Sequence, residues 1–395
     1  MKLVSKKVAG LPPYLFSRIN VLKLEAYRKN LDVIDLSMGN PDLPTPPHIV
    51  ERLSETVREH PRTHRYPQAK GMPKFRAAAA EWLEGRFGVR MDPSREVLAL
   101  IGSKEGIAHL CMAVLDPGDV ALVGNPGYPV HFNGVYLAGG KVRFVPLKKD
   151  RNWLPDLDAI PEKTARKAKL LILNYPNNPT AAVVEGLEFF EKAVRFAKKH
   201  GILLVHDNAY SEITFDGYRA PSLMQVPGAK DVGVEFFSFS KTYNMAGWRV
   251  GFVAGRGDLL APLEKLKSFL DYGVPTFIQL AAVWALKSPQ DCVGGIVEAY
   301  RRRRDYMVSG LGKIGWDVPS PKATMYLWAE IPEPFRKMGS LAFSEKLVKE
   351  TGVTVSPGVG FGPYGEGYVR IALVTHDRRF HDALLRIKKF LRKSV

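Results

Sequence analysis

The sequence predicts an α/β fold in which helices sandwich a large, mostly parallel sheet, with a smaller α+β domain beside it. Between about residues 95 and 255, short apolar runs alternate with amphipathic helical patterns. Apolar runs without internal alternation are typical of strands buried on both faces of a parallel sheet. After about residue 285 the pattern changes to longer helices with single strands between them. This change predicts a second, smaller unit.

Seven apolar runs are expected to form the large sheet, and two clear helical patterns lie between them. A run of four to eight apolar residues bounded by turn residues favours a strand, whereas apolar residues spaced three and four apart favour a helix. The expected strands lie at residues 97–101, 120–123, 142–147, 170–173, 202–206, 234–239 and 250–254, and the helices at 106–115 and 187–199.

The C-terminal part is expected to hold a long helix near 296–314 and a final helix at 378–393. Strands are expected at 325–329, 353–355 and 368–373, with a helix at 341–350. A proline-rich stretch at 41–47 separates an N-terminal arm from the first unit. We therefore predict a large domain at 45–285, with residues 1–44 and 286–395 forming the arm and the small domain.

Composition excludes several classes of protein. The chain has 395 residues, of which 46% are hydrophobic, so it can bury a large core. No apolar run reaches the roughly 18 residues of a membrane span, and no apolar segment follows the charged first residues as in a signal peptide. Cys111 and Cys292 lack CxxC spacing. Reduced thiols in a cytoplasmic protein without a membrane anchor are expected.

The formal net charge of +17 raises the alternative of nucleic-acid binding. The charge is dispersed, and its one dense run is Arg301, Arg302, Arg303 and Arg304 within a helical stretch. Four successive helical positions splay around the helix axis, so they do not form one DNA-reading face. No aromatic-interleaved basic patch or zinc-finger spacing occurs. A solvated helix with some arginines at an interface or a ligand is favoured, and no nucleic-acid partner is expected.

Polar residues follow five of the expected strands. Ligands of open α/β sheets bind beyond the carboxyl ends of the strands. A hydroxyl-bearing turn, an aromatic ring, an amide, a carboxylate and an amine would therefore meet at one edge of the sheet and form a small-molecule site. In chain order these residues are Ser103, Tyr128, Asn178, Asp207 and Lys241.

Lys241 and Asp207 carry the strongest chemical hypotheses. An amine held at the end of a rigid strand can form a Schiff base with a carbonyl, although most lysines are simply solvated. A carboxylate at the end of a buried strand is costly without a cationic partner. A protonated pyridine nitrogen would be such a partner, and the alternative for Asp207 is a capping or turn residue.

The segment Gly102-Ser103-Lys104 is a glycine turn that opens a helix. Free backbone N–H groups, a hydroxyl and the helix dipole suit a phosphate group, but Ser103 could equally be an N-cap. Ser238 and Arg249 flank Lys241 and could add phosphate contacts. The alternative for Arg249 is pairing with a surface carboxylate.

With these residues the chain resembles the class I aminotransferases of pyridoxal phosphate (PLP) fold type I. The resemblance rests on Lys241 with its flanks, Asp207 through Tyr210, Asn178-Pro-Thr180 and Arg370 in Tyr368-Val-Arg370-Ile-Ala. It extends from residue 35 to the final helix. The flanking motifs are most similar to bacterial glutamate–pyruvate (alanine) aminotransferases and LL-diaminopimelate aminotransferases.

This resemblance implies a role for each matching residue. Lys241 would hold the cofactor covalently and shuttle protons, Asp207 would pair with the pyridine nitrogen, and Tyr128 would stack on the ring. Arg370 would clamp the substrate's α-carboxylate, which lysine cannot copy. The remaining expected contacts are Asn178 and Tyr210 to the ring hydroxyl, Ser103, Lys104, Ser238 and Arg249 to the phosphate, Tyr66 to the phosphate from a second subunit, and Gly39 and Asn178 to the substrate.

Two departures from the family pattern bear on shape and substrate. Ala181 replaces the usual glycine after Thr180, so the turn is expected to avoid a glycine-only conformation. No counterpart of the arginine that binds a second carboxylate in aspartate-specific relatives is found, and residues 267–275 occupy that region. We expect alanine or glutamate as donor, in a homodimer that needs no metal. LL-diaminopimelate transamination is the alternative, and a PLP-dependent lyase a more distant one.

The sequence disfavours three unrelated functions. Ser238-Phe-Ser-Lys241 matches the S-x-x-K of serine acyl-enzymes, but no S-D-N or K-T-G partner occurs. The segment 360–365 matches G-x-G-x-x-G, yet it contains a proline and precedes a strand, so a dinucleotide site is not expected. A DNA-binding regulator of this resemblance would need an additional N-terminal domain.

Overall fold

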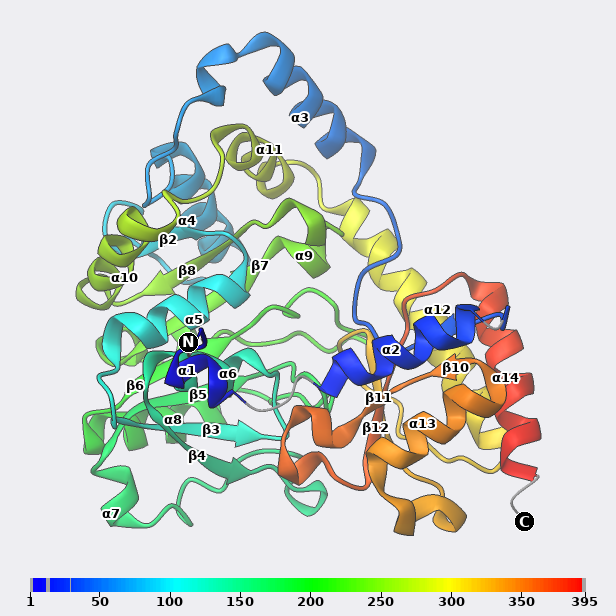
Figure 1. Cartoon of the computed structure of the whole chain (residues 1–395). Coiled ribbons are helices and arrows are strands. Elements are labelled where there is room, and N and C mark those ends of the chain that lie inside the picture. Colours follow the sequence, from blue (N-terminus) through cyan, green and yellow to red (C-terminus); the bar gives the residue numbers. More distant parts are fainter. Residues whose placement is uncertain (1–2, 12–14, 29, 393–395) are drawn as a thin grey trace.

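A seven-stranded sheet forms the centre of the larger part of the molecule (Figure 1). The computed structural model describes residues 3–11, 15–28 and 30–392. The strand order is β2-β8-β7-β6-β5-β3-β4, and within this sheet only β8 runs antiparallel to its neighbours. The strands are β2 (Val97–Leu100), β3 (Val120–Asn125), β4 (Lys141–Pro146), β5 (Ala168–Asn174), β6 (Leu203–Asp207), β7 (Gly233–Ser238) and β8 (Gly251–Gly255).

Helices cover both faces of this sheet because its strands are apolar on both sides. In β2, Val97 and Ala99 belong to one core, whereas Leu98 and Leu100 belong to the other. The first core takes in helices α4 (Pro73–Phe87), α8 (Glu188–His200) and α11 (Thr276–Lys287), and the second takes in α5 (Ser103–Val114), α6 (Val130–Ala138) and α10 (Gly257–Leu270). The predicted α/β class with a mostly parallel sheet is confirmed.

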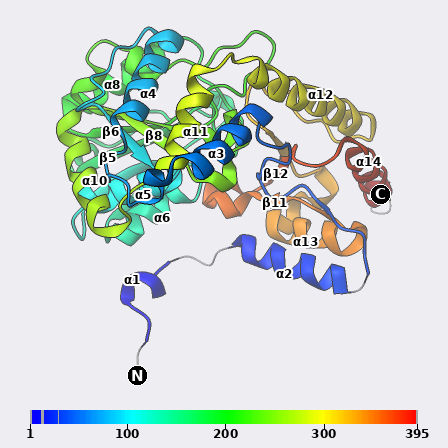
Figure 2. The same ribbon diagram turned by 90° about the horizontal axis from the view of Figure 1, so that it is seen from above.

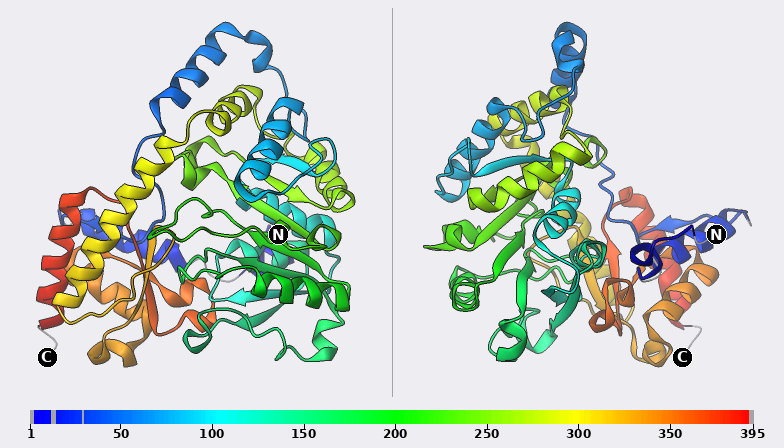
Figure 3. Two further views of the ribbon diagram at one scale, coloured as in Figure 1. Left: turned by 180° about the vertical axis from the view of Figure 1, so that it is seen from behind. Right: turned by 60° about the vertical axis from the view of Figure 1, so that its left-hand side comes forward.

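A separate core surrounds a three-stranded antiparallel sheet in the order β11-β12-β9. Helix α2 lies along α13 (Figure 2), and α12 runs beside α14 (Figure 3). The elements are β9 (Tyr326–Glu330), β10 (Val353–Thr354), β11 (Ser356–Pro357), β12 (Tyr368–Ala372), α2 (Leu15–Arg28), α12 (Asp291–Lys313), α13 (Gly339–Thr351) and α14 (Asp377–Arg392).

Two further segments complete the chain. Helix α1 (Lys6–Ala9) contacts α6, and α3 (Pro47–Glu59) packs on α11 at the top of Figure 1. Strand β1 (Ile34–Asp35) pairs with β10. In the described residues no helix is long and apolar enough to cross a membrane. Both cysteines are free thiols, with Cys111 buried and Cys292 partly exposed.

Several boundaries differ from the sequence-based expectation. The strand expected at 353–355 is present as β10, which ends at Thr354, and β11 begins at Ser356 and belongs to a different sheet. The helices α3, α4, α10 and α11 were not singled out as clear patterns, and α4 has apolar residues around much of its circumference. Lys393, the expected last residue of the final helix, lies outside the described residues. The division at residues 45 and 285 stays a prediction.

The arginine run of α12 serves packing more than solvation. Arg303 is 5% exposed and forms ion pairs with Asp42 and Asp377. Arg304 is 3% exposed and pairs with Asp216. Two of the four arginines therefore fix α12 to neighbouring segments, which agrees with the expectation of interfacial arginines.

Asp35 joins the N-terminal arm to the small core. It accepts hydrogen bonds from Lys23 Nζ at 2.8 Å, Ser37 Oγ at 2.6 Å and Thr354 Oγ1 at 2.7 Å. Burial alone would raise the pKa of Asp35, but the bonds from Lys23 and Ser37 outweigh it and lower the pKa to about 2. The charged form of Asp35 is therefore the form that stabilises the fold.

We expect Asp35→Asn to lower the free energy of unfolding at pH 7 by about 1–2 kcal/mol, a range reduced for partial exposure. Because the pKa of Asp35 is lowered on folding, its contribution is complete above the usual aspartate pKa of 3.8 and disappears as the pH falls towards 2. Urea unfolding at several pH values measures the difference. Asp317→Asn, at an exposed site, is the control, and a pH-independent difference would contradict the expectation.

Candidate active site

A cavity of about 1300 Å³ opens beyond the carboxyl ends of β3, β5, β6 and β7. Eleven of the twelve residues predicted for the site line it, which places residues from distant parts of the chain around one space. They are Gly39, Ser103, Lys104, Tyr128, Asn178, Asp207, Tyr210, Ser238, Lys241, Arg249 and Arg370.

Lys241 projects from a short helix that directly follows β7. The strand ends at Ser238, whose hydroxyl accepts a hydrogen bond from Ser240 N and so caps helix α9 (Phe239–Thr242). The amine therefore stands on a capped helical turn and not on the strand itself. Lys241 Nζ donates to Gly39 O at 2.7 Å. Burial lowers the pKa of Lys241, which favours the uncharged, nucleophilic amine.

Asp207 lies at the end of β6 with only 3% of its surface exposed. Its Oδ2 atom is 3.0 Å from His131 Nε2, and Asn174 Nδ2 donates to its backbone carbonyl at 2.7 Å. Its Oδ1 atom is buried and has no hydrogen-bond partner among the described residues. Such an atom is costly to leave unpaired, so the site has an unmet need for a donor facing this oxygen.

Arg370 reaches the cavity from β12 of the small core. Its Nη1 donates to Asn178 Oδ1 at 2.7 Å and its Nη2 to Ser37 O at 2.8 Å. Within the described chain its Nε is buried without an acceptor. The guanidinium carbon lies 4.2 Å from the ring centre of Tyr326 and 4.7 Å from that of Phe361. The group is thus held in place with donor capacity left for an anion.

Two tyrosine hydroxyls meet between Arg370 and Lys241. The hydroxyls of Tyr210 and Tyr326 are 3.0 Å apart, and Asn178 Nδ2 donates to Tyr210 at 3.4 Å. Burial raises the pKa of Tyr210. Burial also acts to raise the pKa of Tyr326, but the charges of Arg370 and Lys241 bring it below its usual value. The hydroxyl of Tyr210 therefore keeps its proton, whereas the hydroxyl of Tyr326 gives up its proton more readily.

The start of α5 forms a cradle of backbone amides. Gly102 is the N-cap residue with a φ of +78°, and no side chain caps the helix. Ser103 is the first helical residue, so the alternative of an N-cap serine is wrong. A Cβ at Gly102 would lie 2.6 Å from Arg249 Nη2. Arg249 donates to the carbonyls of Ala246 and Ile101, so serine hydroxyl, amides and guanidinium share one pocket suited to an anion.

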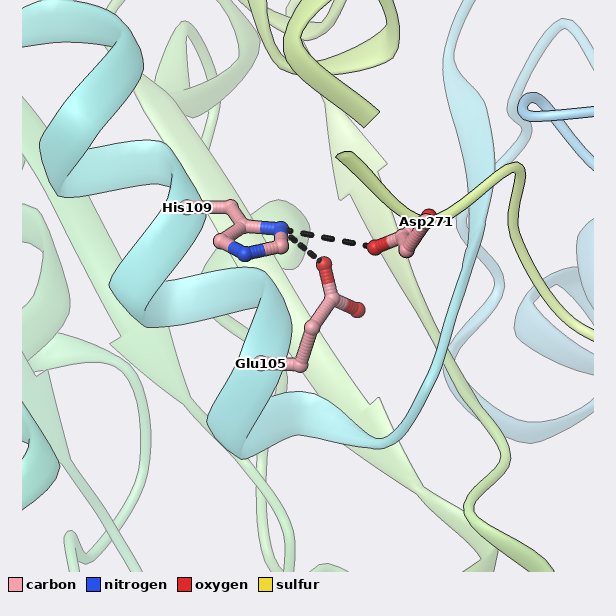
Figure 4. Close-up of side chains that lie close together, drawn as sticks. All are labelled: Glu105, His109 and Asp271. Atoms are coloured by element: carbon pink, nitrogen blue, oxygen red, sulfur yellow. Dashed lines mark ion pairs between the residues drawn. The ribbon is translucent and has the colours of Figure 1, made fainter. Parts of the chain in front are cut away.

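A charged cluster stands beside the cradle (Figure 4). His109 Nδ1 faces Glu105 Oε1 at 2.5 Å and Asp271 Oδ2 at 3.6 Å. Three such side chains can hold a metal ion, but Lys267 Nζ already contacts Glu105 at 3.0 Å and Asp271 at 3.1 Å. An ammonium group therefore supplies the positive charge, and the cluster joins α5 to the end of α10.

Tyr66 is the predicted residue that this chain does not bring to the cavity. It is 89% exposed, and its ring centre lies 5.6 Å from that of Tyr272, which is itself 57% exposed. The expected role of Tyr66 was in a second subunit's site, and its outward position leaves that role a prediction.

Sequence reasoning did not assign roles to His131 and Tyr326, which contact Asp207 and Arg370. His131 follows Tyr128 by three residues on α6, so helical spacing could have placed it nearby. The start of β9 alone does not indicate where Tyr326 points. The expectation for Ala181 was wrong: its φ is +57°, a left-handed conformation that glycine favours. Its N–H donates to Asn177 O at 2.9 Å, which holds the turn.

The chain is similar to known aminotransferases over nearly its whole length. Residues 31–386 match the family model "Aminotransferase class I and II". The chain is 50% identical to glutamate-pyruvate aminotransferase AlaC of Escherichia coli, over 98% of this chain and 93% of the relative, and 47% identical to LL-diaminopimelate aminotransferase of Moorella thermoacetica, over 98% of each. Substrate-bound BacF of Bacillus subtilis superposes with a TM-score of 0.94, at 37% identity, over 99% of this chain and 98% of that one.

Proposed function

The chain belongs to the class I and II aminotransferase family, and on that premise we propose that it moves an amino group between alanine or glutamate and a 2-oxo acid with pyridoxal 5'-phosphate as cofactor. The observation that carries this proposal is the meeting of Lys241, Asp207 and Arg370 in one cavity. These groups supply an amine for a carbonyl, a carboxylate for a cation and a guanidinium for a carboxylate.

The residues present fit pyridoxal phosphate. The buried, unpaired Oδ1 of Asp207 matches a protonated ring nitrogen, and the cradle of Ser103 and Arg249 matches a phosphate. Lys241 stands in the same cavity with a lowered pKa. When bound there, the cofactor would supply a positively charged ring that withdraws electrons from the substrate's α-carbon. Tyr128, Asn178, Tyr210, Lys104 and Ser238 are proposed as its further contacts.

The chain's own residues divide the remaining work. Arg370 would fix the substrate by its α-carboxylate, with Asn178 and the backbone of Gly39 nearby. Lys241 would take the proton from the α-carbon as a general base, and then deliver it as a general acid. Burial favours this exchange because it lowers the pKa of Lys241 and so favours the uncharged amine. Tyr210 would donate its hydroxyl hydrogen towards the ring oxygen.

The choice of alanine or glutamate rests on similarity and on the clamp. A relative with 50% identity is named for glutamate and pyruvate, and both amino acids need only an α-carboxylate clamp and a modest pocket. LL-diaminopimelate transamination is the second candidate, since several relatives at 47–50% identity carry that name. A lyase of the same fold would release ammonia or carbon dioxide, which product analysis distinguishes from transamination.

A half-reaction screen tests the proposal. Each amino acid, including LL-diaminopimelate, is mixed with the PLP-loaded enzyme while the cofactor's absorbance is followed. Alanine or glutamate should bleach the band at the highest rate and leave a stoichiometric 2-oxo acid. A faster reaction with LL-diaminopimelate would move the proposal to the second candidate. No bleaching with any amino acid would refute transamination.

We expect Arg370→Lys to raise the KM for the amino donor about 10- to 100-fold, because lysine offers no bidentate fork and loses the contacts with two aromatic rings. Steady-state kinetics with the preferred donor measures the change. The matched control is Arg195→Lys, since Arg195 is exposed on α8. A KM within threefold of the wild-type value would exclude Arg370 as the clamp.

A homodimer with a shared site is also proposed. The outward position of Tyr66 supports it, since a ring that is 89% exposed is available to a second copy of the chain. Tyr272, whose ring contacts that of Tyr66, is exposed as well, and so are Phe269 and Leu270 at the end of α10. The cytoplasmic location stays a prediction from cysteine usage.

A further inference from the structure

The G-x-G-x-x-G segment at 360–365 is clasped by a side chain of the other core. Asn125, at the end of β3, is fully buried. Its Nδ2 donates to Phe361 O at 3.0 Å, and its Oδ1 accepts from Tyr364 N at 2.9 Å. Gly127 N also donates to Phe361 O, at 2.9 Å. The segment thus packs against a loop of the large sheet.

The fit between these two loops explains the glycine at position 362. Gly362 has a φ of +107°, and a Cβ there would overlap the Asn125 amide. Any residue with a Cβ atom is therefore disfavoured at position 362, both by the positive φ and by the overlap with Asn125. Such a close approach fixes the position of the segment relative to Asn125.

The clasped segment carries one of the two rings over Arg370. Tyr326 is held by the pairing of β9 with β12, in which Ala372 faces it. Phe361 is the last residue of a short 3-10 helix (Gly358–Phe361) outside the sheets, so its position depends on the contacts that this segment makes. Within the small core, Ser340 Oγ accepts from Val359 N at 3.1 Å. From the large core, the side chain of Asn125 holds this loop through its two hydrogen bonds.

We propose, on the basis of the proposed function, that Asn125 is a positioning residue for substrate binding, which holds Phe361 against Arg370 and so keeps the carboxylate clamp ordered and shielded from water. Asn125 stands three residues before Tyr128 on the same loop. One loop thus carries both Tyr128, the proposed contact of the cofactor ring, and Asn125, which holds Phe361 over Arg370. A guanidinium shielded from water binds a carboxylate more strongly than a hydrated one.

The test compares PLP-loaded wild-type enzyme with Asn125→Ala, Asn125→Asp, Gly362→Ala and the double variant Asn125→Ala/Gly362→Ala. Propionate, which has a carboxylate but no amino group, serves as a competitive inhibitor. We expect each single variant to raise the Ki of propionate and the KM of the donor about tenfold, as for a lost buried hydrogen bond. The rate at saturating donor and the cofactor's absorbance should change little, because Lys241 and Asp207 are untouched.

Coupling between the two positions gives a second readout. The double variant should raise Ki by less than the product of the two single effects, because both changes open the same contact. Lys149→Met is the matched control, since Lys149 joins the two cores through Glu330 at 3.1 Å but is 60% exposed. It should leave Ki unchanged. Asn125→Asp preserves the size of the side chain and the acceptor for Tyr364 N, and it removes only the donor to Phe361 O. It therefore tests the proposal even if the alanine variants do not fold.

The outcomes separate this inference from the proposed function. Folded Asn125 variants with a propionate Ki within twofold of wild type would overturn it while leaving transamination intact. A rise in KM that is matched by an equal fall in the rate at saturating donor would indicate a general structural role and would also overturn it. A raised Ki of propionate in Lys149→Met would do the same. A wild-type enzyme that neither binds propionate nor reacts with an amino acid would instead contradict the proposed function.

Discussion

Lys241→Ala is expected to lower the rate of the half-reaction by about four orders of magnitude or more, because it removes both the nucleophile and the general base. Alanine is expected to leave the fold intact, since the Lys241 amine donates to a backbone carbonyl of a loop, that of Gly39. Single-turnover absorbance with saturating donor measures the rate. Thermal melting verifies that the variant is folded.

The control for this experiment is another lysine. Lys265→Ala removes an exposed amine on α10 and should leave the rate unchanged. Added primary amines such as methylamine should partly restore proton transfer in Lys241→Ala, because the cavity then has room for a small base. A Lys241→Ala variant that keeps a tenth of the wild-type rate would refute the assignment.

Asp207→Asn is expected to slow the half-reaction about a hundred- to a thousandfold, as when one preorganised electrostatic contact is removed from a buried site. Asparagine keeps the size of the side chain, but it has no negative charge to pair with a protonated ring nitrogen. The loss should therefore appear in the rate at saturating donor. The same single-turnover assay measures it, and cofactor titration reports any weaker binding.

The structure also supplies a control for Asp207. Asp231→Asn changes an exposed carboxylate that pairs with Lys198 at the surface, so its rate should match the wild type. His131 offers a third comparison, because its Nε2 contacts Asp207 Oδ2 and not the unpaired Oδ1. His131→Gln should have a smaller effect than Asp207→Asn. A rate within tenfold of wild type in Asp207→Asn would remove this carboxylate from the reaction.

The sequence predicted the strands of the large sheet and the residues at their ends. A strand buried on both faces is a continuous apolar run, and burial is a local property that composition records directly. The polar residues that follow such a run then mark the sheet edge at which ligands of α/β sheets bind. Asp207, Asn178 and Lys241 could be found in this way, although helix α9 after β7 was not.

Helices with apolar residues around their circumference were harder to predict. Helix α4 buries seven of its residues on several sides, so it lacks the single apolar stripe by which a surface helix is recognised. The conformation of Ala181 was also out of reach. Its left-handed φ depends on hydrogen bonds within the turn, which the residue type alone does not reveal.

The sequence by itself determined the fold class and the family, and it predicted the amine, carboxylate and guanidinium of the proposed site. Only the tertiary structure decided how these groups are held. Phe361 and Tyr326 cover Arg370, and Asn125 fixes Phe361 from 236 positions away in the chain. The physical reason is that local patterns encode burial and secondary structure, whereas contacts between two cores depend on how whole elements pack.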